Sequence, residues 1–279
     1  MNHLDDHEFA KYLATETGKR LVELRNSLVS RGVSGWDLKD AGDAMAQEFL
    51  MSQLREFRPD DAVLSEEALD NSKRLTAQRV WIVDPLDGTQ EFSEPDRIDW
   101  AVHIALWQRH ANHDPHTKPN SLADSGSCTT PNARAESGSL IAAAVSLPAI
   151  ELTLSTNPPP APPRKHDGPP RLVVSRTRTP REAVIVAEAL GCDAMRLGSA
   201  GAKAMSVVLG ECDIYLHTGG QHQWDSAAPV AVARAAGLHT SRVDGSPLIY
   251  NEQDTWLPDL IVCRPELAEP VLFALGHKK

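Results

Sequence analysis

The sequence lacks an excess of basic residues. Its 279 residues contain 28 Lys and Arg against 38 Asp and Glu, which gives a formal net charge of −10 at pH 7. A protein that binds a nucleic-acid backbone needs a basic surface, so this balance argues against a nucleic-acid polymer as partner. A phosphorylated small molecule would need local positive charge on such an acidic chain, and a bound metal would supply it.

Paired cysteines and long apolar runs are also missing. Cys128, Cys192, Cys212 and Cys263 are scattered and form no C-x-x-C pair, so we expect reduced, mostly buried thiols rather than a zinc site or a disulfide framework. The first residues lack the basic start and apolar core of a signal peptide. No apolar stretch is long enough to span a bilayer. We therefore expect a soluble, cytoplasmic protein without a membrane partner.

The residues that are present predict a layered α/β architecture. The chain is 41% hydrophobic, enough for one large or two modest domains. Apolar residues spaced three and four apart predict helices, over 4–30, 43–57, 180–190, 199–210, 225–236 and 265–276. Runs rich in Val, Ile and Trp predict strands, at 62–64, 80–83, 100–107, 172–174, 213–216 and 260–263. Alternation of the two kinds favours stacked layers of sheets and helices.

Two segments interrupt this pattern. Residues 108–138 are polar and predict a long loop, after which 139–154 return to strand-like composition. Residues 156–170 are rich in proline and predict a stiff connector, with a docking ligand for a proline-binding module as the alternative. We therefore divide the chain into an α+β half (1–155), this connector, and an α/β half (171–279).

Chemistry concentrates in the run from Asp84 to Thr89. An apolar strand ends at Asp84, and Pro85 cannot sit inside a ladder, so we expect a turn there. Asp87 then lies three residues on, where it can converge with Asp84 on one cation, and the Leu86 carbonyl adds an oxygen. The alternative, ordinary turn and capping residues, is typical of a lone D-x-x-D. The strand before the run and the Gly and Thr after it favour the metal site.

The end of the same run suits an anion. Gly88 has no side chain, so a ligand can approach its backbone closely. Thr89 offers a hydroxyl, and a helical turn that begins there directs free N–H groups at a phosphate. The segment is therefore suited to hold metal and phosphate together.

Acidic residues elsewhere in the chain fit the same site. Glu66 and Glu67 follow a predicted strand, where the reading as metal ligands and the reading as solvated acids are evenly matched. Asp225 follows Trp224 and opens a helix, so it is able to cap that helix and to bind a metal at once.

Three motifs together resemble one family. The run from Trp81 to Phe92 resembles the signature of the inositol monophosphatase superfamily, 65–67 (Ser-Glu-Glu) its upstream acidic motif, and 224–228 (Trp-Asp-Ser-Ala-Ala) its downstream motif. This resemblance implies a layered αβαβα sandwich of the inositol monophosphatase and fructose-1,6-bisphosphatase type. It also implies lithium-sensitive, Mg²⁺-dependent hydrolysis of phosphomonoesters with two or three Mg²⁺ per site.

The resemblance also assigns the site residues. The implied metal ligands are Glu66, Asp84, the Leu86 carbonyl, Asp87 and Asp225. The implied phosphate contacts are Gly88 and Thr89, next to the metal ligands Glu66, Leu86, Asp87 and Asp225 that also face the substrate. The implied mechanism is displacement of phosphate by water that Glu66, Thr89 and Asp43 position and activate. The start of the helix at Ser199 and the nearby Lys203 are candidate contacts for a sugar or a second phosphate, with an ordinary helix start and a solvated lysine as the alternative.

Within the superfamily, Gln90-Glu91-Phe92 after the signature is similar to the CysQ branch. The segments 99–107 and 244–251 are similar to its actinobacterial, mycobacterial form. This implies a 3′(2′),5′-bisphosphate nucleotidase, which converts 3′-phosphoadenosine 5′-phosphate (PAP) to AMP and phosphate in the metabolism of sulfate and sulfated nucleotides. The alternatives are an inositol monophosphatase or a fructose-1,6-bisphosphatase, and a non-enzymatic metal-binding regulatory protein.

Three features depart from the family pattern. The stretch 37–43 differs from the relatives and keeps only its final acid, Asp43. Thr218 stands seven residues before Asp225, where inositol monophosphatases have an acid that binds inositol hydroxyls, so inositol is disfavoured. The polar segment 108–138 looks like an insertion. Many relatives are homodimers, and the sequence contains no signature of an interface.

Overall fold

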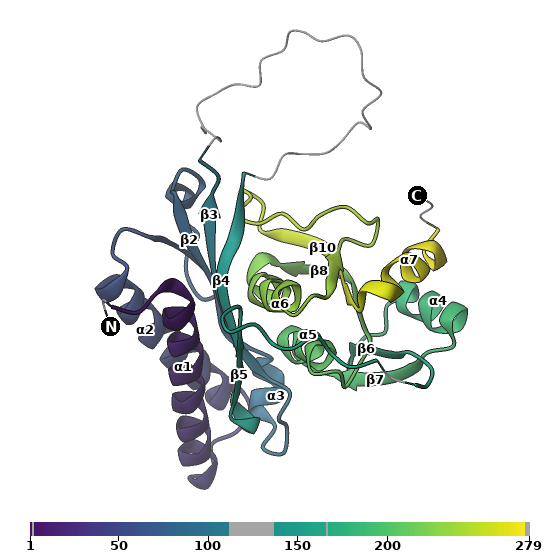
Figure 1. Ribbon diagram of the computed structural model, residues 1–279. Coiled ribbons are helices and arrows are strands. Elements are labelled where there is room, and N and C mark those ends of the chain that lie inside the picture. Colours follow the sequence, from purple (N-terminus) through teal and green to yellow (C-terminus); the bar gives the residue numbers. More distant parts are fainter. Residues whose placement is uncertain (2, 112–136, 166, 277–279) are drawn as a thin grey trace.

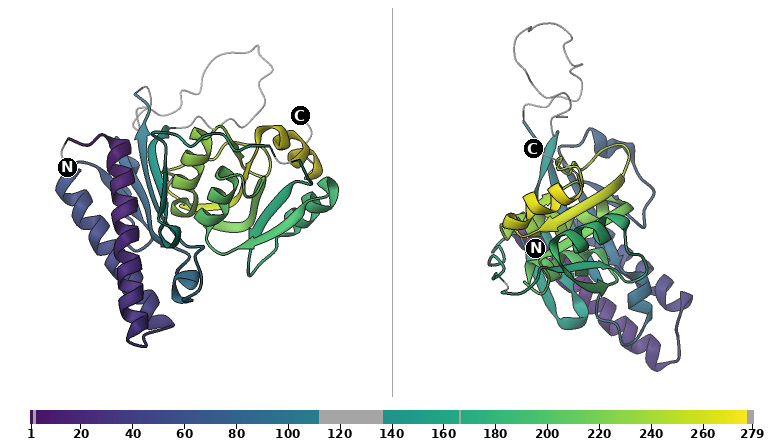
Figure 2. Two further views of the ribbon diagram at one scale, coloured as in Figure 1. Left: turned by 60° about the horizontal axis from the view of Figure 1, so that its bottom comes forward. Right: turned by 90° about the vertical axis from the view of Figure 1, so that its right-hand side faces the viewer.

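The computed structural model describes residues 1, 3–111, 137–165 and 167–276. Their helices and strands form five layers in the order helix, sheet, helix, sheet, helix (Figures 1 and 2). The first sheet has the strand order β1-β2-β3-β4-β5 and the second the order β7-β6-β8-β10-β9. This arrangement agrees with the predicted αβαβα sandwich.

The first sheet and its outer helices are built by the N-terminal half. The helices are α1 (Asp6–Ser30), α2 (Trp36–Phe57) and the short α3 (Thr89–Ser93), with 3-10 turns η1 (Ser72–Leu75) and η2 (Pro148–Ile150). The strands are β1 (Ala62–Ser65), β2 (Arg79–Asp87), β3 (Ala101–Arg109), β4 (Gly138–Leu147) and β5 (Leu152–Ser155). α1 and α2 pack on one face of this sheet around Phe9, Leu50 and Trp81, each fully buried. Aromatic and aliphatic side chains thus close the outer side of the sheet that carries Asp84.

The C-terminal half supplies the other layers. Its helices are α4 (Arg181–Leu190), α5 (Ala200–Val208), α6 (Gln223–Ala235) and α7 (Pro265–Ala274). Its strands are β6 (Arg171–Ser175), β7 (Asp193–Leu197), β8 (Ile214–His222), β9 (His239–Ser241) and β10 (Trp256–Cys263). α6 packs against β2, β3 and β4 on one side and against β8 and β10 on the other. Small residues such as Ala227, Ala228 and Ala231 allow this double contact between two sheets.

Several boundaries differ from the sequence predictions. α2 begins at Trp36, well before the predicted start at 43, because Gly35 takes the N-cap position with a positive φ of 61°. The edge strands β7 and β9 were not predicted, since short, exposed strands show little apolar alternation. Residues 156–165 and 167–170 contain no helix or strand, as expected for a connector. Most of the predicted loop 108–138 lies outside the described residues, although β3 and β4 reach into its ends.

Two expectations concern features that the described residues lack. No helix in the part of the chain that the structure describes is long and apolar enough to cross a membrane. Cys192, Cys212 and Cys263 are free thiols, and Cys128 lies outside the described residues.

Candidate active site

A β-bulge brings Asp84 and Asp87 to the same face of β2. In a regular strand, residues three apart point to opposite faces. Here Asp84 pairs with His103 and Asp87 with Ala101, so three steps along β2 match two along β3. The extra residue of the bulge rotates Asp87 back onto the face of Asp84. The predicted turn at Pro85 is therefore wrong: the strand continues to Asp87, and Pro85 falls in the bulge, where no ladder hydrogen bond is required.

Asp84 is buried among other acids. Its side chain is 1% exposed, and its Oδ1 accepts a hydrogen bond from the Leu86 N–H at 3.1 Å. Burial, and then the charges of Glu66, Asp87 and Asp225, raise the pKa of Asp84 well above its ordinary value. The charge of Asp84 is therefore not compensated by its neighbours.

Asp87 is held by N–H donors instead. Its Oδ1 accepts from the Ala200 N–H at 3.2 Å and its Oδ2 from the Gly201 N–H at 2.6 Å, both in the first turn of α5. His103 Nε2 lies 3.1 Å from Asp87 Oδ2. Burial alone would raise the pKa of Asp87, but the charge and hydrogen bond of His103 and the Gly201 N–H outweigh it and lower the pKa. Asp87 is thus ionised and fixed in orientation.

Glu66 and Asp225 complete the acidic centre, which we define as Glu66, Asp84, Asp87 and Asp225. Burial of its carboxyl, with the charges of Asp225 and Asp87 nearby, raises the pKa of Glu66 to about 7, although much of the residue is exposed. Burial and Asp87 raise the pKa of Asp225 to about 6. Asp225 Oδ2 also accepts the His222 N–H at 2.6 Å, so it caps α6, as expected from its position. Glu66 follows β1, Asp84 and Asp87 lie in β2, and Asp225 lies in α6, so the four acids come from both halves of the chain.

Thr89 and Asp43 lie beside this centre. The Thr89 hydroxyl is 3.4 Å from Asp43 Oδ1 and 3.2 Å from the Leu86 carbonyl oxygen. Burial, and then the charge of Glu67, raise the pKa of Asp43 to about 6. Gly88 precedes Thr89 with a φ of 87°, and a Cβ there would lie 2.8 Å from the Cβ of Ser199. Only glycine therefore lets this turn approach the start of α5 so closely.

Ser199 and Lys203 have structural contacts in this arrangement. The Ser199 Oγ accepts from the Ala202 N–H at 2.9 Å and caps α5. The Lys203 ammonium donates to the carbonyl oxygens of Gly198 and Ser199, and its side chain is 4% exposed. The alternative of a solvated lysine is therefore wrong. Contact of either residue with substrate stays a prediction.

The sequence analysis missed His103. It is fully buried, its Nε2 faces Asp87, and its Nδ1 lies 3.1 Å from the Trp224 carbonyl oxygen. Since both ring nitrogens face acceptors, the imidazolium form is favoured: burial lowers the pKa of His103, but Asp87 more than offsets this and raises it. A Cβ on Gly201 would collide with this ring, so glycine is required there. Only the strand register, which pairs His103 with Asp84, would have pointed to it.

The chemistry of the centre fits a hard cation, but its geometry is not that of a closed metal site. The donors are carboxylate oxygens with the Leu86 carbonyl beside them, the ligands that Mg²⁺ prefers. Within residues 1, 3–111, 137–165 and 167–276, however, no three His, Cys, Asp or Glu side chains are arranged to hold a metal ion. Asp87 faces N–H donors in their place. The metal-ligand roles therefore stay predictions.

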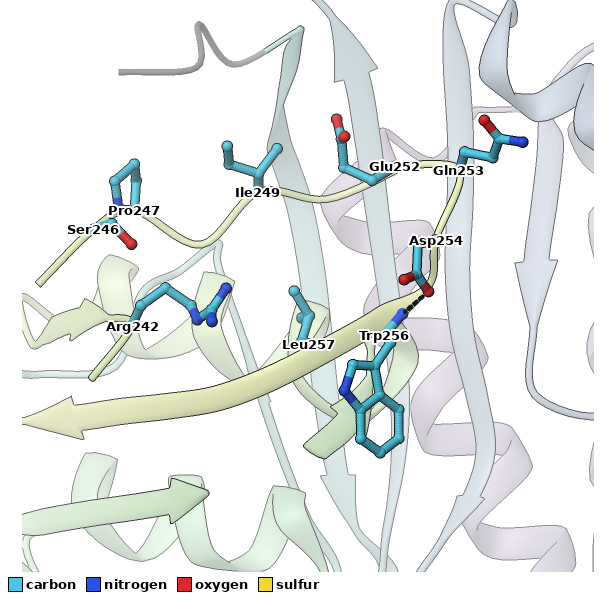
Figure 3. A pocket seen from close by; sticks show the side chains of 9 residues that line it. All are labelled: Arg242, Ser246, Pro247, Ile249, Glu252, Gln253, Asp254, Trp256 and Leu257. Carbon is cyan, nitrogen blue, oxygen red and sulfur yellow. Dashed lines mark hydrogen bonds between the residues drawn. The ribbon is translucent and has the colours of Figure 1, made fainter. Parts of the chain in front are cut away.

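A groove in the described residues lies next to this centre and not in it. It has a volume of about 690 Å³ and is lined by residues of β10 and of the loop before it, among them Arg242, Ile249 and Trp256. Figure 3 displays these side chains around β10, with Trp256 on the side of the strand opposite Leu257. No member of the acidic centre lines the groove. Trp256 connects the two regions, since its ring contacts His222 edge-on at 5.4 Å.

Comparison with known proteins identifies relatives in sequence and in structure. The chain is 45% identical over 279 residues to a 3′-phosphoadenosine 5′-phosphate phosphatase of Mycobacterium leprae, covering 98% of this chain and 93% of that protein. It is 29% identical over 228 residues to the 3′(2′),5′-bisphosphate nucleotidase CysQ of Escherichia coli, covering 78% and 81%. The crystal structure of the extragenic suppressor protein suhB from Bartonella henselae superposes with a TM-score of 0.71 at 18% identity, covering 98% and 99%.

The family predicted from the motifs is thereby confirmed. The model of the inositol monophosphatase family matches residues 6–116 and 163–273, which contain every member of the acidic centre. The family and the phosphatase relatives imply dependence on a divalent metal. The chain belongs to the inositol monophosphatase family.

Proposed function

We propose that this protein is a Mg²⁺-dependent phosphomonoesterase that hydrolyses PAP to AMP and phosphate, in the metabolism of sulfate and sulfated nucleotides. The observation that carries the proposal is the acidic centre: Glu66, Asp84 and Asp225 all have raised pKa values beside two helix N-termini. Perturbed carboxyls of this kind mark functional sites. The name of the M. leprae relative, at 45% identity over 98% of this chain, supports PAP as substrate.

The acidic centre requires more positive charge than His103 provides, since the pKa values of Glu66, Asp84 and Asp225 stay raised. Glu66, Asp84, the Leu86 carbonyl, Asp87 and Asp225 would hold two or three Mg²⁺ ions, because hard cations take oxygen ligands. When bound, these ions supply Lewis-acid stabilisation of the charge that develops on the phosphoryl group. His103 and the first N–H groups of α5 fix Asp87 in the orientation described above.

The side chains next to the acidic centre position water and phosphate. Thr89 and Asp43 orient the attacking water, and the Asp43 carboxyl, with a pKa of about 6, is poised to accept its proton near neutral pH. Glu66 faces the same water. The backbone N–H groups at Gly88 and Thr89, at the start of α3, meet the phosphate oxygens. Asp87 and Asp225 stand on the side of the leaving ester oxygen.

One contact favours a nucleotide over inositol. Thr218 occupies the position of the inositol-binding acid, and its hydroxyl donates to Glu182 of α4 at 2.8 Å, on the outer side of the second sheet. No carboxylate therefore reaches the substrate from this position in the described chain. An inositol monophosphatase or fructose-1,6-bisphosphatase activity remains the alternative to test.

The test is phosphate release from PAP with saturating Mg²⁺. We expect Asp87→Asn to lose turnover nearly completely, while wild type prefers PAP over inositol 1-phosphate and fructose 1,6-bisphosphate by on the order of tenfold, about 1.4 kcal/mol. Li⁺ should inhibit the wild-type reaction. Near-normal activity of Asp87→Asn would contradict the site assignment. Binding of Mg²⁺ without hydrolysis of any of the three substrates would favour a non-enzymatic protein.

A further inference from the structure

The edge of the second sheet that carries Asp225 also carries a pair of glycines. β6, β7 and β8 are parallel, so their carboxyl ends lie at one edge. Ser199 follows β7, and Asp225 follows β8. In such sheets ligands bind outside the carboxyl ends of the strands. Gly219 and Gly220 lie near the end of β8 with φ values of 99° and 92°, a backbone conformation that favours glycine.

Two large side chains lie on these glycines. A Cβ on Gly219 would collide with the guanidinium of Arg178, and a Cβ on Gly220 would collide with the indole of Trp256. The guanidinium thus lies against one glycine of the pair and the indole against the next. They come from separate segments, since Arg178 lies in the loop after β6 and Trp256 begins β10. The two glycines thus make room for a cation and an aromatic ring at the end of β8.

Both side chains are exposed to solvent to a large extent. Arg178 is exposed and makes no hydrogen bond or ion pair with any residue that the structure describes. Arg176, two residues earlier, is bound to Glu91 and Glu94 at 2.8 to 3.0 Å. Trp256 is 48% exposed, and in Figure 3 its indole extends from β10 on the side opposite Leu257. The guanidinium of Arg178 and the indole of Trp256 are therefore both accessible to a ligand at this edge of the sheet.

The pair is connected to the acidic centre. The Trp256 ring contacts His222 edge-on with centroids 5.4 Å apart, and the His222 N–H donates to Asp225 at 2.6 Å. Gly219 lies three residues before His222, about 10 Å of extended chain at roughly 3.3 Å per residue. A nucleotide is long enough to bridge this separation.

A substrate with two phosphates needs two positively charged partners. The reacting phosphate belongs at the acidic centre, where metal supplies the charge. The other phosphate needs a cation from the protein, and Lys203 and Arg176 already have internal partners. Guanidinium pairs with phosphate through charge-assisted hydrogen bonds, and a purine stacks on an indole.

We propose that Arg178 and Trp256 form the recognition subsite for the non-reacting end of the substrate, with Arg178 on the 5′-phosphate and Trp256 on the adenine. This inference rests on the proposed function and specifies its substrate contacts. It assigns the preference for a nucleotide to a cation and an aromatic ring on the diglycine at the edge of the second sheet.

The experiment compares Arg178→Met and Trp256→Leu with wild type. Steady-state kinetics on PAP should give an unchanged kcat in both variants, while KM rises about 10- to 100-fold for Arg178→Met and about 5- to 100-fold for Trp256→Leu. The matched controls are Arg181→Met, an exposed arginine in the first turn of α4, and Phe273→Leu, a phenylalanine of α7 that is 66% exposed. Both controls should leave KM unchanged.

Direct binding of AMP and adenosine, measured by calorimetry, separates the two contacts and does not depend on turnover. Arg178→Met should weaken AMP but not adenosine, and Trp256→Leu should weaken both. Unchanged AMP affinity in folded Arg178→Met, or wild type that binds no AMP up to millimolar concentration, overturns the subsite. Wild type that binds AMP through Arg178 but does not hydrolyse PAP overturns the proposed function and keeps the subsite.

Discussion

Asp84 and Asp213 are the same residue type at the same depth, since each is 1% exposed, but their surroundings are opposite. Asp213 accepts from Arg171 Nε at 2.9 Å and from the Arg171 N–H at 2.8 Å, and Arg264 Nη1 lies 3.1 Å away. Burial would raise the pKa of Asp213, but these partners outweigh it and lower the pKa. Asp84 faces other carboxyls, and its pKa is raised.

The contrast separates two uses of a buried acid. Asp213 ties β6, β8 and α7 together and needs nothing further, because its charge is compensated within the fold. Asp84 has no basic partner of this kind, so its charged form is disfavoured until a cation compensates it. Carboxyls of the second kind mark a site, and those of the first kind mark scaffolding.

The largest expected effect is loss of catalysis in Asp84→Asn. This change replaces one carboxylate oxygen with an amide NH₂ group and keeps the shape of the side chain. The value of kcat/KM for PAP should therefore fall about 100-fold or more. The melting temperature without metal should stay the same or rise, because one repelling charge is gone. Phosphate release and thermal melting check the two parts. A variant that melts far below wild type would show that Asp84, like Asp213, stabilises the fold.

A smaller effect is expected at His103, which contacts Asp87 and is not itself a proposed metal ligand. His103→Leu should raise the Mg²⁺ concentration for half-maximal activity about 10- to 100-fold, because an outer partner of a ligand is lost. The measurement is a Mg²⁺ titration of PAP hydrolysis. His7→Leu, which alters a histidine of α1 that contacts Thr156 at 2.8 Å, is the control. An unchanged titration in His103→Leu would contradict the positioning role.

Removal of Asp213 should affect stability and not catalysis. Asp213→Asn leaves Arg171 and Arg264 without their counter-charge, so the free energy of unfolding should fall by about 2–3 kcal/mol. A fully buried pair would cost more, but Arg171 is 23% exposed. Urea denaturation measures this. Asp259→Asn, which breaks the more exposed pair with Arg242, should cost about 1 kcal/mol or less. Equal losses would remove the distinction between the two pairs.

The two regions should also differ in their dependence on pH. The folded pKa values of Glu66, about 7, and Asp225, about 6, lie above the ordinary carboxyl value, so the folded protein retains protons that the unfolded chain has released. Stability of the metal-free protein should therefore fall as pH rises from about 4 to about 7.

Asp213 has the opposite sign, because its lowered pKa adds stability above about pH 4 and loses it below. Melting temperature against pH in EDTA measures the balance, and Mg²⁺ should flatten the fall between pH 4 and 7. A rise over that range would show that the acidic centre is compensated within the protein.

Sequence reasoning located the acids because their motifs are local. The run from Asp84 to Thr89, with Glu66 before it and Asp225 far behind it, indicated a site, and the structure brings these residues together. The reason is that strand ends and helix starts carry readable signals.

The parts that failed depend on contacts distant in sequence. His103 lies within an apolar strand and gains its meaning only from the register with Asp84. The bulge at Pro85 was taken for a turn, since proline excludes a ladder bond in both. For Lys203 a solvated side chain was one of two alternatives, but its ammonium donates to the carbonyl oxygens of Gly198 and Ser199 before α5. Pattern alone contains none of this information.

The acidic centre draws on both halves of the chain, and this division has a consequence for how the protein assembles. Asp87 and Asp225 are separated by more than a hundred residues, and contact between the two sheets is made by α6 packing on β2, β3 and β4. Contacts so distant in sequence form late, after each half has its helices and strands. During refolding, far-ultraviolet ellipticity should therefore return before the ability to release phosphate. The time at which phosphate release returns would then measure when the two halves of the chain pack together.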